Sequence, residues 1–150
     1  IYTGEDTLSL HDALPISSIG AACFDLHADL LVRHSIQIDH GNPAIIGTGI
    51  AVEIPPGFVM LVFSRSGHGF TNSVRLGNCV GVIDSDYRGE VMVKLTADVF
   101  GMAIIGQGDR IAQAMVIPYP QVSFECVDEL SSTTRGTGGL GSTGQGAING

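Results

Sequence analysis

Residues 77–94 read GNCVGVIDSDYRGEVMVK, and we interpret the rest of the chain outward from this stretch. Two apolar, strand-like runs flank a connection that carries Asp84, Tyr87 and Gly89. This arrangement predicts a β-hairpin, although the connection is longer than the tight two-residue type. A hairpin mouth holds a carboxylate rigidly within reach of a ligand, so Asp84 is a candidate catalytic base. Taken alone, the same residues also fit an ordinary turn.

The composition predicts one globular, strand-rich domain. The chain has 150 residues, of which 44% are hydrophobic and 15% are charged, so it is long enough to bury a substantial core. Its 21 glycines, about double the usual share, indicate many turns and a loop that approaches something closely. We expect neither a membrane span nor a secretory signal, because no long apolar run and no basic leader are present.

The formal net charge of −8, with only seven Lys and Arg residues, argues against a protein that binds nucleic acid directly. Four of these cations nevertheless lie within or beside glycine-rich turns: Arg65, Arg88, Arg110 and Arg135. This placement predicts a small polyanionic ligand, accompanied by a divalent metal that offsets the repulsion. Three cysteines without a CxxC pair indicate free thiols in a reducing compartment, so we expect a cytoplasmic protein.

Short strand-like runs separated by turn signals follow one another from Ala21 onward. We expect strands at residues 24–28, 36–38, 45–54, 59–63, 80–83, 90–95, 111–117 and 122–127. Helical character is confined to part of residues 67–74. Regular short strands with turns between them predict an all-β sandwich, barrel or jelly roll.

The composition divides the chain into three parts. Residues 1–19 contain LSLHDALPIS, which looks like a translated cloning adapter, so we leave this N-terminal segment out of the functional argument. Residues 20–130 are expected to form the β-barrel core. Residues 131–150 form a glycine-rich C-terminal arm, which has no apolar face to bury and should order only on an anion.

Glycine patterns in the arm suggest two nucleotide-binding motifs, and both fail. A G-x-G-x-x-G pattern begins at Gly136, but no acid and no room for a helix follow it, as a dinucleotide fold requires. Gly139–Gly144 resembles a phosphate loop, yet Gln145 stands where that motif requires Lys. What remains is a set of backbone amides beside Arg135 that suits phosphate oxygens; a disordered linker is the alternative.

Five short motifs occur in order along the chain: Ala22–Ala28 (ACFDLHA), Arg65–Gly67 (RSG), Gly77–Gly89 (GNCVGVIDSDYRG), Gly108–Gln113 (GDRIAQ) and Arg135–Gly144 (RGTGGLGSTG). Each is weak alone, but together they resemble the trimeric deoxyuridine triphosphate pyrophosphatase (dUTPase) family. The resemblance implies a jelly-roll (β-clip) protomer in a homotrimer, with active sites shared between subunits. It also implies Mg²⁺-dependent hydrolysis of dUTP to dUMP and pyrophosphate, which limits uracil in DNA and supplies dUMP for thymidylate synthesis.

The resemblance also implies a role for each matched residue. Asp84 would be the general base that activates water, Tyr87 would pack against the deoxyribose and exclude a 2′-hydroxyl, and Asp25 would reach Mg²⁺ through water. Asn78 and neighbouring hairpin backbone would read the uracil edge, and the other substrate-binding residues of this stretch would be Gly81, Val82, Ile83 and Met92. The phosphates would contact Arg65, Ser66, Gly67 and Gln113. The arm would close over the nucleotide with Arg135, Gly139, Leu140, Gly141 and Ser142.

Three residues depart from the family pattern. Leu140 stands where the arm usually has a Phe that covers the uracil, and the lost stacking should weaken closure by about 1 kcal/mol. Cys23 replaces a Gly of the first motif, and Ser64 replaces the Pro before the second.

Two alternative functions remain open at this point. A dCTP deaminase shares the fold, but it needs a Glu acid/base at the base ring, whereas this chain has the Asp of IDSDY and a complete arm. A regulatory dUTPase-fold protein, which binds nucleotide and signals through a partner with little or no turnover, is kept open by Leu140. We expect no membrane partner.

Overall fold

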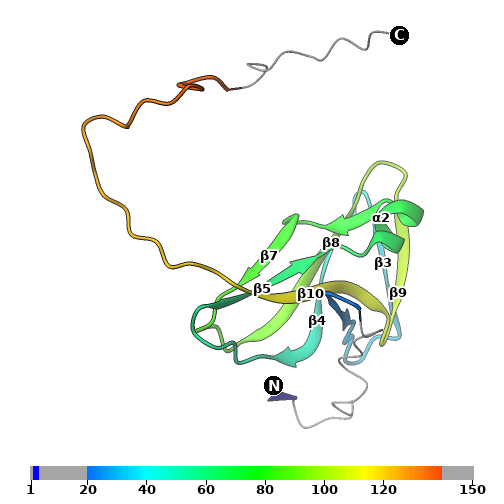
Figure 1. Cartoon of the computed structure of the whole chain (residues 1–150). Helices are drawn as coiled ribbons and strands as arrows, with labels where there is room; N and C mark the ends of the chain where they lie inside the picture. The colour runs from blue at the N-terminus through cyan, green and yellow to red at the C-terminus, as the bar shows by residue number, and fades with distance from the viewer. Residues whose placement is uncertain (1, 4–19, 140–150) are drawn as a thin grey trace, which may run out of the picture.

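The computed structural model describes residues 2–3 and 20–139, and this part of the chain is almost entirely β (Figure 1). The strands are β1 (Tyr2–Thr3), β2 (Phe24–His27), β3 (Ser35–Asp39), β4 (Ala44–Ala51), β5 (Phe58–Phe63), β6 (Val74–Leu76), β7 (Val80–Ile83), β8 (Glu90–Ala97), β9 (Met102–Gly106) and β10 (Arg110–Pro118). The short helix α2 (Ser66–Asn72) lies where helical character was expected. No helix among these residues is long and apolar enough to cross a membrane.

Two four-stranded antiparallel sheets form the body of the protein. Their strand orders are β1-β4-β8-β6 and β2-β10-β5-β7, and β3 pairs with β9 in a separate two-stranded sheet. Sequence alternation explains the inner and outer faces, because Val91, Val93 and Leu95 of β8 are buried while Met92 and Lys94 between them are exposed. This architecture confirms the expected all-β jelly-roll class.

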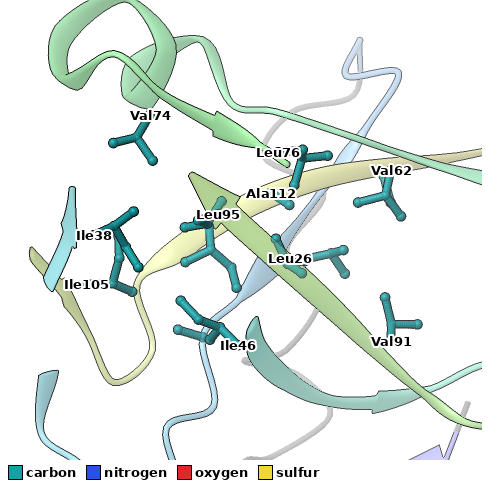
Figure 2. Close-up of a cluster of buried hydrophobic side chains, with 14 of the residues drawn as sticks. Leu26, Ile38, Ile46, Val62, Val74, Leu76, Val91, Leu95, Ile105 and Ala112 are labelled. Carbon is teal, nitrogen blue, oxygen red and sulfur yellow. The ribbon is translucent and has the colours of Figure 1, made fainter. Parts of the chain in front are cut away.

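The core holds the strands that carry the candidate site. Figure 2 shows apolar side chains from both large sheets and from β3 and β9 converging on one interior. Leu26, Ile46 and Leu95, from three different strands, are each at most 2% exposed. Burying a side chain of this size contributes about 1.5–3 kcal/mol. Thr48 is the one buried polar residue among those described, and its hydroxyl donates to the Val91 carbonyl at 2.6 Å.

The predicted hairpin at 77–94 is wrong. β7 pairs with β5, whereas β8 pairs with β4 and β6, so the two runs lie in different sheets. The connection at residues 84–89 therefore carries the chain from one sheet to the other. The physical reason is length, because β8 has eight residues and β7 only four. The long-range partner β4, also eight residues long, offers β8 more backbone pairing than its neighbour in sequence could.

The predicted strand at 122–127 is also wrong, because residues 119–139 contain neither helix nor strand. Val122 and Phe124 are 70% and 95% exposed, and this segment leads away from the barrel in Figure 1. Pro118 and Pro120 each lack the amide donor that would continue the β10 ladder. The alternating residues at 122–127 favour an extended strand, but no strand of the described chain pairs with this segment. Conversely, β6 and β9 were not anticipated from the sequence.

Gly101 fixes the turn between β8 and β9 against the end of α2. A Cβ there would lie 2.6 Å from the Ser73 carbonyl, 2.9 Å from the Asn72 carbonyl and 3.0 Å from the Asp98 carbonyl. Gly101→Ala must therefore move backbone, and we expect it to lower the free energy of unfolding by about 1–3 kcal/mol. Urea unfolding measures this loss. Gly41→Ala is the matched control, since its Cβ would meet only Asp39 Oδ1 at 3.8 Å; equal midpoints for both variants would contradict the prediction.

Candidate active site

Asp84 directly follows β7 and begins the connection between the two large sheets. The residue is exposed, and its carboxylate takes part in none of the ion pairs formed by residues 20–139. β7 is anchored along its whole length by β5, with Met60 paired to Ile83 next to Asp84. A rigid strand therefore presents a free carboxylate at its end, which is suitable for orienting a water molecule and accepting its proton.

The connection after Asp84 holds its own shape. The Tyr87 amide donates to the Asp84 carbonyl at 3.2 Å, and Tyr87 Oη donates to the Glu90 carbonyl at 3.0 Å. Arg88 Nη1 donates to the Ser85 and Tyr87 carbonyls at 2.7 and 3.0 Å. These bonds fix the tyrosine relative to the carboxylate before any ligand arrives, so little ordering is left to oppose binding.

A pocket of about 330 Å³ lies along β7 and β8. It is lined by Ile45, Val62, Leu76, Asn78, Gly81, Val82, Ile83, Met92, Val93 and Lys94. Asn78, which the family resemblance assigns to the uracil edge, and the predicted substrate-binding residues Gly81, Val82, Ile83 and Met92 are among them. The lining is apolar except for Asn78 and Lys94, and the Asn78 amide offers both a donor and an acceptor. An apolar slot with one such amide suits a flat heterocycle that carries adjacent carbonyl and N–H groups.

A second, larger cavity of about 430 Å³ shares Ile45 and Met92 with this pocket. Its lining includes the carboxylates of Asp29 and Glu90 but no Lys or Arg. Glu90 Oε1 is already committed to the backbone, because it accepts from the amides of Thr48 at 3.0 Å and of its neighbour Gly49 at 2.9 Å. An acidic wall repels a triphosphate, so we do not assign the nucleotide to this larger cavity.

A second polar cluster gathers around Asp25 on β2. Arg65 Nε lies 2.9 Å from Asp25 Oδ1, and Arg110 Nη1 lies 3.3 Å from Asp25 Oδ2. The side chain of Asp25 is only 13% exposed, whereas that of Arg110 is 52% exposed. The carboxylate thus holds two guanidinium groups in place while their outer faces stay available. Such a pair of arginines suits phosphate oxygens.

Gln113 and His68 support this cluster. Gln113 stands between Asp25 and Phe63 in the paired row across the sheet, and its Nε2 donates to the Ser64 carbonyl at 3.1 Å. His68 Nε2 lies 3.0 Å from the Arg110 carbonyl. The Gln113 amide nitrogen therefore orders the backbone just before the Arg65–Gly67 turn. Ser66 and Gly67 of that turn begin α2 and are exposed.

Asp84 and the Asp25 cluster lie far apart within one subunit. Both border the sheet β2-β10-β5-β7, in which a row of paired residues runs from Asp25 through Gln113 and Phe63 to Val80. Asp25 is thus three strands from β7 and Asp84 four residues beyond Val80, so ordinary strand spacings separate them by roughly 20 Å. Within this chain, the candidate base Asp84 and the Asp25 cluster therefore cannot reach one phosphorus atom together.

The described start of the arm, residues 131–139, leads away from the barrel in Figure 1. Arg135 Nε donates to the Gly138 carbonyl at 3.0 Å, and the Gly138 amide donates to the Arg135 carbonyl at 3.0 Å. Arg135 and Gly139 are exposed. The predicted contacts of Leu140, Gly141 and Ser142 lie outside the described residues.

Two residues near the phosphate-binding cluster were not proposed as site residues from the sequence. Arg110 completes the pair of guanidinium groups around Asp25, and its position inside the GDRIAQ motif was a usable signal. His68 follows the RSG motif directly, but nothing in the sequence indicated that its ring would reach the Arg110 carbonyl, 42 residues away.

Comparison with known proteins decides the family. The family model described as dUTPase matches residues 11–144. The chain belongs to the dUTPase family. A curated dUTPase from Hahella chejuensis (strain KCTC 2396), named deoxyuridine 5′-triphosphate nucleotidohydrolase, is 42% identical over 126 residues, or 83% of this chain and 82% of the relative. The relative of the same name from Dinoroseobacter shibae is 41% identical over 141 residues, or 90% and 91% of the two chains.

Solved dUTPase structures agree with the fold. The Staphylococcus bacteriophage 80alpha dUTPase with dUPNHPP is 25% identical and aligns with a TM-score of 0.78, covering 93% of this chain and 96% of that chain. The dUTPase from Streptococcus mutans, at 22% identity, aligns with a TM-score of 0.66 over 77% and 93% of the two chains. Because the curated relatives are named as nucleotidohydrolases, neither the deaminase nor the regulatory alternative is favoured.

Asp25 is a single carboxylate, so it could help to hold a metal ion only together with ligands from a bound substrate. Among the described residues, no group of three or more His, Cys, Asp or Glu side chains is placed to hold an ion by itself. Mg²⁺ usually keeps several waters and binds through one or two carboxylates together with substrate phosphates. One carboxylate beside two arginines fits an ion that arrives with a triphosphate. A dUTPase of phage phi11 of S. aureus, 21% identical with a TM-score of 0.67, is described with a structural Mg(II) ion.

Proposed function

We propose that this chain hydrolyses dUTP to dUMP and pyrophosphate, with Asp84 as the general base. The observation that carries the proposal is the continuous arrangement along residues 78–92: an apolar pocket containing the Asn78 amide, then the free carboxylate of Asp84 at the end of β7, then Tyr87 in a fixed loop. Base recognition, water activation and sugar contact thus come from one rigid stretch. Membership of the dUTPase family supports the same reaction.

The chemical step follows from these positions. Asp84 orients a water molecule and accepts its proton as the water oxygen attacks the α-phosphorus. The bond from the α-phosphorus to the oxygen that bridges it to the β-phosphorus breaks, and pyrophosphate leaves with that oxygen. No covalent intermediate with the protein is required. The carboxylate at the strand end holds the water close to the phosphorus and in line for attack, which lowers the activation barrier. Arginine side chains stabilise the negative charge on the phosphate oxygens.

Specificity rests on the pocket and on the loop that follows it. The Asn78 amide pairs with the carbonyl and N–H groups of uracil, while Gly81, Val82, Ile83 and Met92 enclose the ring. A cytosine, with an amino group where uracil has a carbonyl, leaves a buried polar group unpaired, which is costly. Tyr87 packs against the deoxyribose and leaves no space for a 2′-hydroxyl.

The phosphate chain is held by the second cluster. Arg65, Ser66 and Gly67 offer a guanidinium, a hydroxyl and an unobstructed backbone at the end of β5, and Gln113 orders that turn through Ser64. Mg²⁺, when bound with the substrate, supplies neutralisation of the phosphate oxygens, and Asp25 is the carboxylate that would hold it through water. The arm residues Arg135 and Gly139–Ser142 close over the nucleotide.

We also propose a homotrimer in which each active site draws on more than one subunit. The separation of roughly 20 Å between Asp84 and Asp25 supports this, because both must act on one triphosphate. Exposed apolar side chains outside the uracil pocket offer a surface for association: Met102 and Ile104 of β9 are each at least half exposed. The described start of the arm, residues 131–139, leads away from the barrel in Figure 1, which supports a contact with a neighbouring subunit. Three free cysteines support a reducing, cytoplasmic location.

Pyrophosphate release from dUTP, dCTP, dTTP and UTP, each with and without Mg²⁺, tests the reaction. We expect release from dUTP alone and only with the metal, because the pocket discriminates the base and Tyr87 the sugar. Release of pyrophosphate from dCTP as well would show that the pocket does not discriminate uracil from cytosine. A folded protein that binds dUTP but releases nothing would overturn the proposed reaction and restore the regulatory alternative.

A further inference from the structure

The ring of Tyr87 packs directly on the backbone of Gly89. A Cβ built on Gly89 would contact Tyr87 Oη and would lie 2.6 Å from Tyr87 Cζ and 3.1 Å from Tyr87 Cε2. Carbon atoms do not approach one another so closely, so the ring can occupy this position only because residue 89 has no side chain. All three of these atoms belong to the tyrosine side chain, and none belongs to the backbone.

A hydrogen bond from the tyrosine hydroxyl also holds the ring beside the glycine. Tyr87 Oη donates to the Glu90 carbonyl at 3.0 Å, so the hydroxyl reaches across Gly89 to the first residue of β8. The backbone that precedes Gly89 is tied by the bonds from Arg88 Nη1 to the Ser85 and Tyr87 carbonyls. If a methyl group appeared at residue 89, the ring would therefore be the part that moves.

We propose that Gly89 is a positioning residue that sets the discrimination between deoxyribose and ribose. It acts through Tyr87, by letting the ring approach residue 89 closely enough to hold the position in which it blocks the space of a 2′-hydroxyl. The inference rests on the proposed contact between Tyr87 and the sugar. Displacing the ring breaks the Oη bond to Glu90 and opens that space, so UTP becomes a better substrate relative to dUTP.

The structure separates this effect from a loss of folding. Gly89 is not among the described glycines with positive φ, which are Gly49, Gly57, Gly108 and Gly136, so alanine can adopt its backbone conformation. It therefore differs from Gly101, where a methyl group meets backbone carbonyls that cannot swing aside. Gly89→Ala should leave the midpoint of urea unfolding close to that of the unmodified protein.

The test is the ratio of kcat/KM for dUTP to kcat/KM for UTP. We expect Gly89→Ala to lower this ratio by about tenfold, the usual size for losing one steric contact in a binding pocket. Gly41→Ala, a glycine with room for a methyl group outside both clusters, should keep the ratio. In a Tyr87→Ala background the same change at residue 89 should have no further effect, because a residue that acts through the ring cannot act without it.

A spectroscopic readout tests the ring independently of turnover. The chain has three tyrosines and no tryptophan, so the fully 3-fluorotyrosine-labelled protein has three fluorine sites, and Tyr87→Phe identifies the Tyr87 signal. Gly89→Ala should shift that signal and leave the others in place. An unchanged signal, an unchanged ratio, or an equal fall of the ratio in the Tyr87→Ala background would overturn the inference. If Tyr87→Ala itself keeps the ratio, the proposed sugar contact is wrong, and the inference falls with it.

Discussion

Asp84→Asn should lower kcat for dUTP by about 10²- to 10⁴-fold, the usual contribution of a positioned general base. Asparagine has nearly the shape of aspartate but cannot accept the proton of the attacking water. The Asp84 side chain takes part in no ion pair of the described residues, so its neutralisation removes no structural bond. The pocket along β7 and β8 is unchanged, so binding of dUTP should persist. Pyrophosphate release and equilibrium dialysis with a non-hydrolysable analogue measure the two quantities separately.

Two variants make this result interpretable. Asp128→Asn, an exposed acid in the segment after β10, carries the same change in charge outside both clusters and should retain turnover. Asp86→Asn examines the other carboxylate of the same loop. If Asp86→Asn loses turnover while Asp84→Asn keeps it, the general base is Asp86 and our assignment to Asp84 is wrong. Loss of analogue binding in Asp84→Asn would show that the carboxylate acts on binding.

Mixed assemblies of Asp84→Asn and Arg65→Ala subunits should recover activity that neither variant has alone. Arg65 belongs to the cluster around Asp25, roughly 20 Å from Asp84 in the same subunit by strand spacing. If a site takes its base from one subunit and its phosphate contacts from another, mixing creates sites that contain both intact residues. Random assembly of equal amounts leaves about a quarter of the sites complete. Arg65→Ala leaves Arg110 beside Asp25, so the buried carboxylate keeps a partner.

Co-expression with two affinity tags and tandem purification provides the mixed assemblies. Each variant carrying both tags is the background control, and the unmodified chain with the same tags sets the upper limit. Tandem purification removes the homotrimers, which contain no complete site, so we expect the purified mixtures to reach about a third of that limit. Light scattering should give the mass of a trimer. Mixtures at background activity would mean that each site lies within one subunit. That outcome would also require a large movement of β7 relative to β2, because the register of the sheet separates them.

Strand positions could be predicted where the residue pattern is local. β4, β5, β8 and β10 alternate or run apolar over at least six residues, so their burial follows from their own sequence. β6 has only three residues, too few to show a period, whereas β9 was missed although its five residues alternate between exposed and buried positions. At residues 122–127 the alternation is present but the partner is missing, so propensity alone led to a wrong prediction. Pairing of β7 and β8 was wrong for a related reason, since nearness in sequence does not decide which edges combine.

The candidate site divides in the same way. The five motifs, read by their order and spacing, named the family and the residue types of the site: a carboxylate, a tyrosine, an amide and arginines. Only the tertiary structure joined Asp25 to Arg65 and Arg110, which are 40 and 85 residues away along the chain. It also laid the Tyr87 ring on Gly89 and kept Asp84 apart from the phosphate-binding cluster.

By itself, the sequence determined the chemistry that this protein can perform and the strands whose burial follows from their own alternation. The tertiary structure decided which strands pair, which side chains meet, and which of them one subunit cannot bring together. The physical reason is range. Alternation and turn preferences act between residues a few positions apart, whereas strand order and register depend on which distant edges bury the most apolar surface and satisfy the most backbone groups.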